Sequence, residues 1–289
     1  MLKIDRKRTV QLLISGVITI GFLYFFDRFI GFDRLITLFR NITLQQFLLA
    51  FALYLASYLI RTLRWSLSLD LKDLKKLFKL TVFNTFFNII LPFRVGELSF
   101  FYMLKKEGLS LGHTTISFIT TRLFDGIGIV SIFLFFYFLY LDNLLLGLST
   151  LILSPLFFFP VATIMKKIKH HEVLNYQSKL TFKNTIGIYI LTIMTLAFKF
   201  LAFYIILFPL TGLSVSLSFL AFSIADLTTV LPIHGIAGIG TYESGFSGIA
   251  VILGAEKDLA FLSATLVHIF IIFSSSLIAL ITYLTTKNS

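Results

Sequence analysis

The chain has 289 residues, of which 57% are hydrophobic, 35 are phenylalanine and only 13% are charged, and its mean hydropathy is +0.93. A soluble protein cannot cover its surface with so few polar side chains, so these values exclude a soluble globular domain and indicate that most of the chain faces lipid. The sequence contains no cysteine, which excludes disulfides, thiolate metal ligands and a cysteine nucleophile.

Six apolar stretches are long enough to cross a bilayer as helices, which takes about 20 residues. Basic side chains gather at the ends of these stretches, as they do in the cytoplasmic loops of membrane proteins. The excess of 25 Lys+Arg over 14 Asp+Glu therefore indicates orientation and not a nucleic-acid partner. We predict full spans at about 8–31, 43–66, 110–141, 144–165, 185–211 and 258–286.

Two further apolar regions, 77–104 and 216–254, are interrupted by proline and glycine. The first breaks at LPFRVG, and the second breaks at LPIHG, which is followed by two more glycines. Such breaks leave backbone groups without helical partners, which membranes tolerate only inside the protein or beside water. We expect each region to dip into the membrane and return, although the second can also be read as two full spans.

Charge decides the path that we predict for the first broken region. The basic N-terminus and the basic stretch 61–79 lie on the same side if the chain crosses twice between them. The other basic loop, 166–184, shares that side only if 77–104 returns to the side from which it entered. We therefore predict cytoplasmic N- and C-termini, with 216–254 entering from the outside.

The two broken regions resemble each other, which indicates an inverted repeat. Each carries Leu-Pro, then glycine, then glutamate, and 25 residues separate Glu97 from Arg122, as they do Glu243 from His268. The alternative is that proline and glycine merely kink ordinary spans. We predict an all-α polytopic membrane protein with six full spans and two broken re-entrant hairpins in an inverted-repeat arrangement. The ranges are 1–289 for the single transmembrane domain and about 8–141 and 144–286 for its halves.

Charged side chains inside apolar segments cost at least about 2.5–3.5 kcal/mol each, so they mark places where charges pair or line a wet cavity. Arg122 and Asp125 are three residues apart on one predicted helix and can pair, which favours Asp125 as a counter-ion. The planar guanidinium of arginine suits phosphate. This favours a binding role for Arg94 and Arg122 over the alternative, in which these charges only pair with one another and hold the hairpin against the span. The predicted substrate-binding residues are Asn88, Arg94, Glu97, Arg122, Asp125, Lys199, Glu243 and His268.

Two of these residues depend on partners from elsewhere in the chain. Lys199 lies near the middle of its span without an acidic neighbour in sequence, so it must meet water, substrate, or a distant carboxylate such as Glu243 or Asp226. His268 takes the place of Arg122 in the repeat, although a single buried histidine is more often a hydrogen-bonded core residue.

Other polar features are less specific. Asn84 and Asn88 lie one turn apart and can either line the cavity or bond a neighbouring helix. The glycine run 235–240 does not follow a strand, so it does not indicate a nucleotide loop. No metal-ligand spacing or catalytic triad is visible in the sequence, and we expect no metal and no cofactor.

The segment NTFFNIILPFRVGELSFFYMLKKEGLSLGHTTISFITTRLFDGIGI (84–129) resembles the signature of the lysylphosphatidylglycerol synthase transmembrane (flippase-like) family. That signature has an Asn, a Pro-x-Arg-x-Gly-Glu turn and an Arg-x-x-Asp on the next helix. A second segment, ADLTTVLPIHGIAGIGTYESGF (225–246), is similar to the family's proline, glycine-rich turn and glutamate. The matching residues are Asn88, Pro92, Arg94, Gly96, Glu97, Arg122, Asp125, Pro232, Gly238, Gly240 and Glu243.

The resemblance implies a multi-pass protein of the cytoplasmic membrane that moves lipids across the bilayer. Two features depart from the family. The sequence carries no soluble aminoacyl-transferase domain, so the resemblance does not imply synthase activity. His268 stands where an arginine is expected, which argues against a symmetric phosphate clamp.

We therefore expect a flippase or transporter, and not an enzyme, for an anionic or zwitterionic lipid, either a phospholipid or a polyprenyl-phosphate-linked one. The headgroup would cross through a charged cavity at the midplane, driven by a gradient or partner or running downhill, because no ATP-binding motif is present. The alternatives are an intramembrane transferase that uses Glu97 or Glu243 on a lipid phosphate, and a non-catalytic partner of an envelope-lipid synthase. Beyond the lipid, we expect a homo-oligomer or association with a lipid-modifying enzyme.

Overall fold

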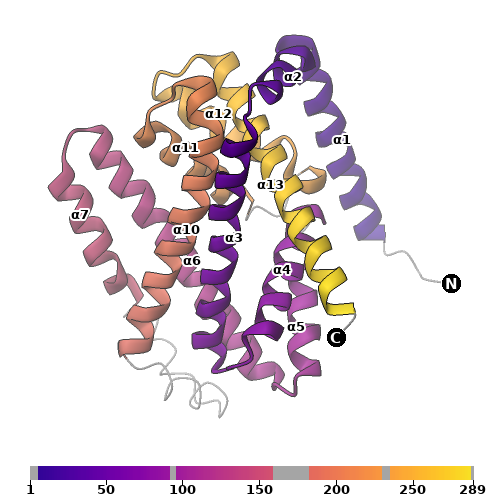
Figure 1. The fold of residues 1–289 in the computed structure, drawn as a ribbon, viewed down its shortest axis with the longest axis vertical. Coiled ribbons are helices and arrows are strands. Elements are labelled where there is room, and N and C mark those ends of the chain that lie inside the picture. Colours follow the sequence, from indigo (N-terminus) through magenta and orange to yellow (C-terminus); the bar gives the residue numbers. More distant parts are fainter. Residues whose placement is uncertain (1–5, 92–95, 159–181, 230–234, 288–289) are drawn as a thin grey trace.

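The computed structural model describes residues 6–91, 96–158, 182–229 and 235–287 (Figure 1). Within these ranges the chain forms helices and no strand. The elements are α1 (Arg6–Phe29), α2 (Phe32–Arg40), α3 (Leu44–Leu69), α4 (Leu74–Ile90), α5 (Gly96–Lys106), α6 (Leu111–Tyr140), α7 (Leu144–Leu153), η2 (Ser154–Phe157), α10 (Phe182–Thr211), α11 (Val215–Thr228), η3 (Ile236–Gly238), α12 (Thr241–Ile252) and α13 (Lys257–Lys287).

Polar side chains define where several helices begin. Each of these side chains precedes its helix and accepts a hydrogen bond from the backbone N–H three residues later, which satisfies one of the unpaired donors of the first turn. The capping residues are Thr43, Asp73, Ser110, Asn143 and Ser214.

The helices α3, α6, α10 and α13 are each long and apolar enough to cross a membrane, which confirms four of the six predicted spans. Their 26 to 31 residues correspond to about 39–46 Å at about 1.5 Å per residue, more than the roughly 30 Å hydrocarbon core. The segment Leu13–Phe29 of α1 passes the same test only together with α2, from which it is bent by 82°. The described part of the chain thus has four or five candidate spans.

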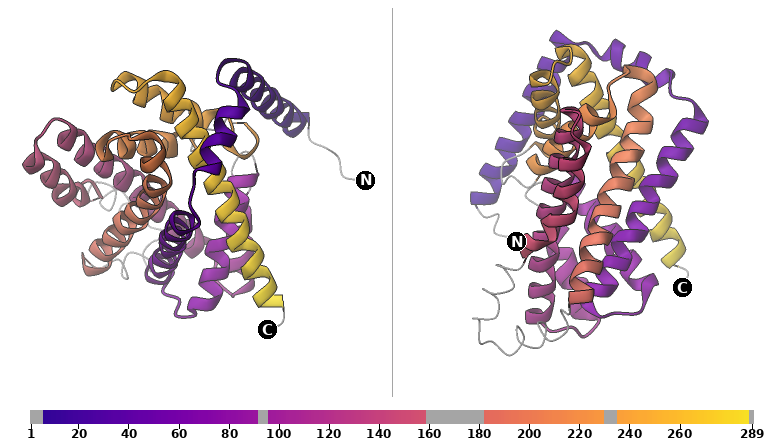
Figure 2. Two further views of the ribbon diagram at one scale, coloured as in Figure 1. Left: turned by 45° about the horizontal axis from the view of Figure 1, so that its top comes forward. Right: turned by 90° about the vertical axis from the view of Figure 1, so that its left-hand side faces the viewer.

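The region predicted as a full span at 144–165 has a different structure where it is described. The helix α7 has 10 residues, about 15 Å, and gives way to the four-residue turn η2. Pro155 lies in this turn and has no N–H to continue an α-helical ladder. Residues 159–165 lie outside the described ranges, so the structure does not confirm a sixth span. Figures 1 and 2 place α7 at the opposite side of the molecule from α1.

Both broken regions form helical hairpins, in which α4 packs on α5 and α11 packs on α12. A 2.8 Å ion pair joins Lys76 in the first turn of α4 to Glu107 just after α5, so the first hairpin begins and ends at the same end of the molecule. That hairpin occupies the lower half of Figure 1 and the α11–α12 hairpin the upper half. The longest of these four helices, α4, has 17 residues, about 26 Å, which is too short to cross the hydrocarbon alone.

Glycine allows the two helices of each hairpin to approach closely. A Cβ atom on Gly96 would lie 2.6 Å from Asn88 Oδ1, and one on Gly245 would lie 2.6 Å from Thr228 Cγ2. Both distances are far inside van der Waals contact, so a larger residue would push the helices apart. These glycines therefore set the packing of the hairpins. The turn η3 of the second hairpin in turn lies against α4 of the first.

The helices α3 and α10 pack along each other, and a side chain from α3 bonds a backbone carbonyl of α10 that has no helical partner. Pro209 lies inside α10 and lacks the N–H that would bond the carbonyl of Ile205. Gln46 Nε2 instead donates to the carbonyl oxygens of Ile205 at 2.9 Å and Ile206 at 3.2 Å. The carbonyl left unpaired by proline is thus satisfied from the neighbouring helix, as a membrane environment requires.

Candidate functional site

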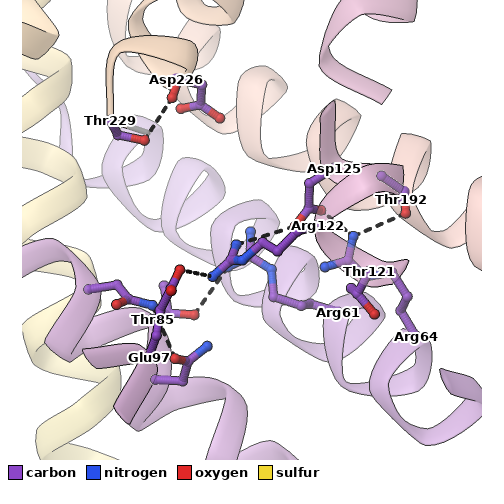
Figure 3. Close-up of polar contacts among 12 residues, drawn as sticks. Arg61, Arg64, Thr85, Glu97, Thr121, Arg122, Asp125, Thr192, Asp226 and Thr229 are labelled. Atoms are coloured by element: carbon purple, nitrogen blue, oxygen red, sulfur yellow. Dashed lines mark hydrogen bonds and ion pairs between the residues drawn. The ribbon is translucent and has the colours of Figure 1, made fainter. Parts of the chain in front are cut away.

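Charged side chains from α3, α5 and α6 meet between the helices, with α10 beside them (Figure 3). Arg122 Nη2 donates to Glu97 Oε1 at 3.1 Å, and Arg122 Nη1 donates to Asp125 Oδ2 at 3.4 Å, the pairing expected from their spacing. Arg64 also bonds Asp125, and it donates to Thr192 Oγ1 of α10 at 3.0 Å. This charged cluster therefore joins the first hairpin to three of the long helices.

The sequence analysis missed two members of the charged cluster, Arg61 and Arg64. We assigned the stretch 61–79 to a basic cytoplasmic loop, but α3 continues to Leu69, so both arginines lie inside the helix. The Arg64 side chain is only 2% exposed, and Arg61 is partly buried. A signal for this was present, because both arginines fall inside the predicted span 43–66 at a spacing that places them on one face.

Arg61 differs from the other cations of the cluster. Within the described ranges it has no carboxylate partner, and its Nη1 donates only to the hydroxyl of Thr85 at 3.1 Å. Its Nε is buried without an acceptor there, as are those of Arg64 and Arg122. Among the described residues, with the neighbouring Lys199–Asp226 pair included, four basic and three acidic side chains leave one positive charge in excess. These seven residues are Arg61, Arg64, Arg122, Lys199, Glu97, Asp125 and Asp226.

Lys199 of α10 forms an ion pair with Asp226 of α11, one of the two carboxylates proposed from the sequence. The two side chains are 12% and 14% exposed, so the pair is largely shielded from the surroundings. The Lys199 ammonium also lies 5.0 Å from the centre of the Phe200 ring. Glu243, the other carboxylate that we considered for Lys199, bonds a histidine instead.

Glu243 of α12 and His268 of α13 form a second buried pair, with 2.7 Å between Glu243 Oε1 and His268 Nδ1. The equal 25-residue spacing in the sequence thus corresponds to two similar contacts. In each, a glutamate in the first turn of a short hairpin helix meets a side chain of the following long helix: Glu97 with Arg122, and Glu243 with His268.

The remaining predicted site residues are Arg94 and Asn88. Arg94 lies outside the described residues. Asn88 Nδ2 donates to Asn84 Oδ1 at 3.0 Å along the same helix, and Asn88 Oδ1 is buried without a donor in the described structure. The two asparagines therefore bond each other, whereas we had considered bonds to a neighbouring helix. A substrate-binding role for any of these residues stays a prediction.

The described residues contain no group of three or more histidine and acidic side chains that could hold a metal ion. A groove of about 370 Å³ lies between α3 and α10, where Gln46, Tyr204 and Pro209 form part of its wall. No member of the charged cluster lines this groove, so it is not the predicted charged cavity.

Comparison with protein families identifies the chain. A family model described as the lysylphosphatidylglycerol synthase TM region matches residues 11–279. The chain belongs to this family. Comparisons with curated proteins and with solved structures gave no match. The chain is an integral membrane protein, because it belongs to this lipid-related membrane family and has apolar spans. The matched region includes both hairpins and the charged cluster.

The chemistry of the charged cluster in this family member suits an oxyanion. Arginine presents several N–H donors in a planar fork that matches phosphate or carboxylate oxygens. Arg64 and Arg122 already donate to carboxylates, whereas Arg61 donates only to a hydroxyl in the described structure. An anionic group that approached Arg61 would also balance the excess positive charge of the cluster.

Proposed function

We propose that this protein is a lipid flippase or transporter that carries the headgroup of an anionic or zwitterionic lipid across the cell membrane. The observation that carries the proposal is Arg61, a partly buried cation without a carboxylate partner among the described residues, set in a cluster of charges between apolar spans. A bare bilayer penalises transfer of a charged headgroup heavily, and fixed charges with spare hydrogen-bond donors lower that barrier.

The arrangement of the hairpins suggests how the path alternates. The proposal takes α4–α5 and α11–α12 as re-entrant pairs that enter from opposite sides of the membrane, as their short lengths and their positions at opposite ends of the long helices support. The halves 8–141 and 144–286 would then form an inverted repeat that rocks about the charged cluster, with both termini cytoplasmic. A homo-oligomer or an associated lipid-modifying enzyme is compatible with this arrangement.

The test is translocation of labelled phosphatidylglycerol or phosphatidylethanolamine in liposomes that contain the purified protein. Arg61→Gln should leave folding nearly intact, because it removes only one hydrogen bond to a neutral hydroxyl. It should slow translocation about tenfold or more, since a hydrogen bond to a charged group contributes about 1.5–3 kcal/mol. Arg34→Gln is the matched control, because Arg34 forms an exposed ion pair with Asp258 away from the charged cluster.

Arg122→Ala should abolish translocation while the protein is still expressed at a near-normal level. Arg122 forms ion pairs with both Glu97 and Asp125, so loss of folded protein in this variant would instead indicate that these charges only hold the helices together. A normal rate in Arg61→Gln would contradict the role of Arg61. A chemically altered lipid would replace the transport proposal with an intramembrane transferase. Absence of both translocation and chemistry in the wild-type protein, with a synthase co-purifying, would make it a non-catalytic partner.

A further inference from the structure

The Glu243–His268 pair holds the glycine-rich turn before α12 in place. Glu243 Oε2 accepts a hydrogen bond from the backbone N–H of Gly240 at 2.7 Å. His268 Nδ1 lies 2.7 Å from Glu243 Oε1, and His268 Nε2 lies 3.0 Å from the carbonyl oxygen of Ala237. The Glu243 and His268 side chains are 2% and 5% exposed, so water does not replace these bonds.

The hydrogen-bond partners determine how many protons the pair must hold. The carbonyl of Ala237 can only accept, so His268 Nε2 must carry a hydrogen. The short contact between His268 Nδ1 and Glu243 Oε1 needs one further proton, which belongs either to an imidazolium facing a carboxylate or to a carboxylic acid facing a neutral imidazole. Without that proton, the neutral imidazole has a single N–H for two acceptors, so either Glu243 Oε1 or the Ala237 carbonyl oxygen would face a ring lone pair and lose its hydrogen bond.

We propose that Glu243 and His268 form a proton-binding site, and that release of its single shared proton breaks one of the two His268 hydrogen bonds and so loosens the glycine-rich turn (235–240) from α13. The proton goes to an ordinary base such as water or buffer, and no covalent bond other than the N–H or O–H bond breaks. The coupling of this step to lipid movement rests on the proposed function, whereas the proton site itself does not.

The glycine-rich turn is a suitable element for such a switch. Ala237 has a φ of 54°, a left-handed conformation that is unfavourable for a residue with a Cβ and must be held by its surroundings. The backbone N–H of Ile236 donates to Thr19 Oγ1 of α1 at 2.8 Å, and η3 lies against α4. Loss of a hydrogen bond to His268 would weaken the attachment of the turn to α13, while these contacts and the bond from Gly240 N–H to Glu243 Oε2 remain.

The first hairpin lacks this property. Its equivalent contact joins Glu97 to Arg122, and a guanidinium does not lose its proton in proteins. The two similar contacts therefore differ in chemistry: one is permanently charged, and the other is an ion pair or a neutral pair that can lose a proton. The histidine that departs from the expected arginine thus places a proton-dependent step in the second half of the chain.

Few other ionisable groups of the described residues surround the pair. The Tyr242 ring is tilted against the His268 ring, with 4.7 Å between the ring centres, and Tyr242 interacts electrostatically with Asp226, Glu243 and Tyr54. Asp226 is already paired with Lys199, and the Tyr54 hydroxyl bonds Ser275 of α13 at 2.9 Å. The polar residues near the end of α4 are Asn84, Thr85 and Asn88, none of which titrates. The ion pair between α2 and α13, Arg34–Asp258, lies in the first turn of α13, far along the helix from His268. The shared proton is therefore the titratable element of this contact.

The chain has no cysteine, so single cysteines report on the glycine-rich turn without background. Ile236→Cys places a thiol on the turn at a side chain that is 44% exposed, and Ile252→Cys at the end of α12, which is 78% exposed, is the control. The ratio of their alkylation rates, measured in nanodiscs between pH 5 and 9, cancels the common effect of thiol ionisation. One-proton linkage predicts that this ratio rises with pH, by up to about tenfold per pH unit within the titration range.

His268→Gln keeps a donor for Glu243 or Ala237 but cannot titrate, so it should make the ratio independent of pH. His268→Arg, which restores a permanent cation, should do the same. If the alkylation ratio does not change with pH in the protein that retains His268, the proposal is overturned. A pH-dependent ratio that persists in His268→Gln would overturn it as well. If neither His268 variant folds, the pH dependence of the alkylation ratio in the protein with His268 decides the proposal by itself.

Liposome translocation at the same pH values tests the coupling separately. It should depend on pH in the wild type and lose that dependence in His268→Gln. Absence of translocation at every pH would refute the proposed function, while the alkylation ratio would still decide the proton site.

Discussion

The buried pair Lys199–Asp226 permits a quantitative test of whether the interior charges are structural or functional. Both side chains are nearly enclosed, at 12% and 14% exposure, and the Asp226 carboxylate has no other cationic partner within the described helices. Lys199→Met removes the cation and leaves the carboxylate buried alone, which should lower the free energy of unfolding by about 3–5 kcal/mol. Asp226→Leu leaves the ammonium alone and should cost a similar amount.

The double variant Lys199→Met with Asp226→Leu removes both charges together. Because desolvation offsets most of the attraction between buried ions, it should lie within about 1–2 kcal/mol of the wild type, so the changes should be strongly non-additive. If Lys199 only holds α10 to α11, the double variant should also recover translocation. If Lys199 contacts the headgroup, stability should return while translocation stays lost, which is the outcome that we expect.

Stability is measured by thermal unfolding in detergent, followed through the fluorescence of Trp65. This residue is the sole tryptophan of the chain and is 2% exposed, so its emission reports on the packed interior. A Lys199→Met protein as stable as the wild type would refute the reasoning, because it would mean that the carboxylate is not held by the ammonium. Strictly additive changes in the double variant would refute it as well.

Two packing predictions use controls within the same helices. Gln46→Leu should cost about 0.5–2 kcal/mol, because the Ile205 carbonyl that Pro209 leaves unpaired loses its donor. The exposed neighbour Gln45→Leu should have little effect on the melting temperature. Gly245→Ala should cost about 1–3 kcal/mol, because the new Cβ would meet Thr228 at 2.6 Å; Gly248→Ala in the same helix meets nothing within 4 Å and should be neutral or stabilising. Equal melting temperatures within either pair would contradict the packing described here.

The sequence alone determined the class of the protein and its four longest spans, because hydrophobic length is a local property that needs no tertiary contact. It also determined the family, whose motifs are local. The equal spacings of Glu97–Arg122 and Glu243–His268 both correspond to contacts, while the inverted repeat stays a prediction. The stretch 144–165 shows the limit of this reasoning, because composition did not reveal where α7 ends.

Only the tertiary structure decided which charges meet. Lys199 had two possible partners in sequence, and the packing of α11 on α12 beside α10 selected Asp226 and left Glu243 to His268. Arg61 and Arg64 could be read as loop residues until α3 was seen to continue past them. Pairing of this kind depends on distances between helices that are far apart in the chain, whereas hydrophobic periodicity and spacing report only on neighbours along it.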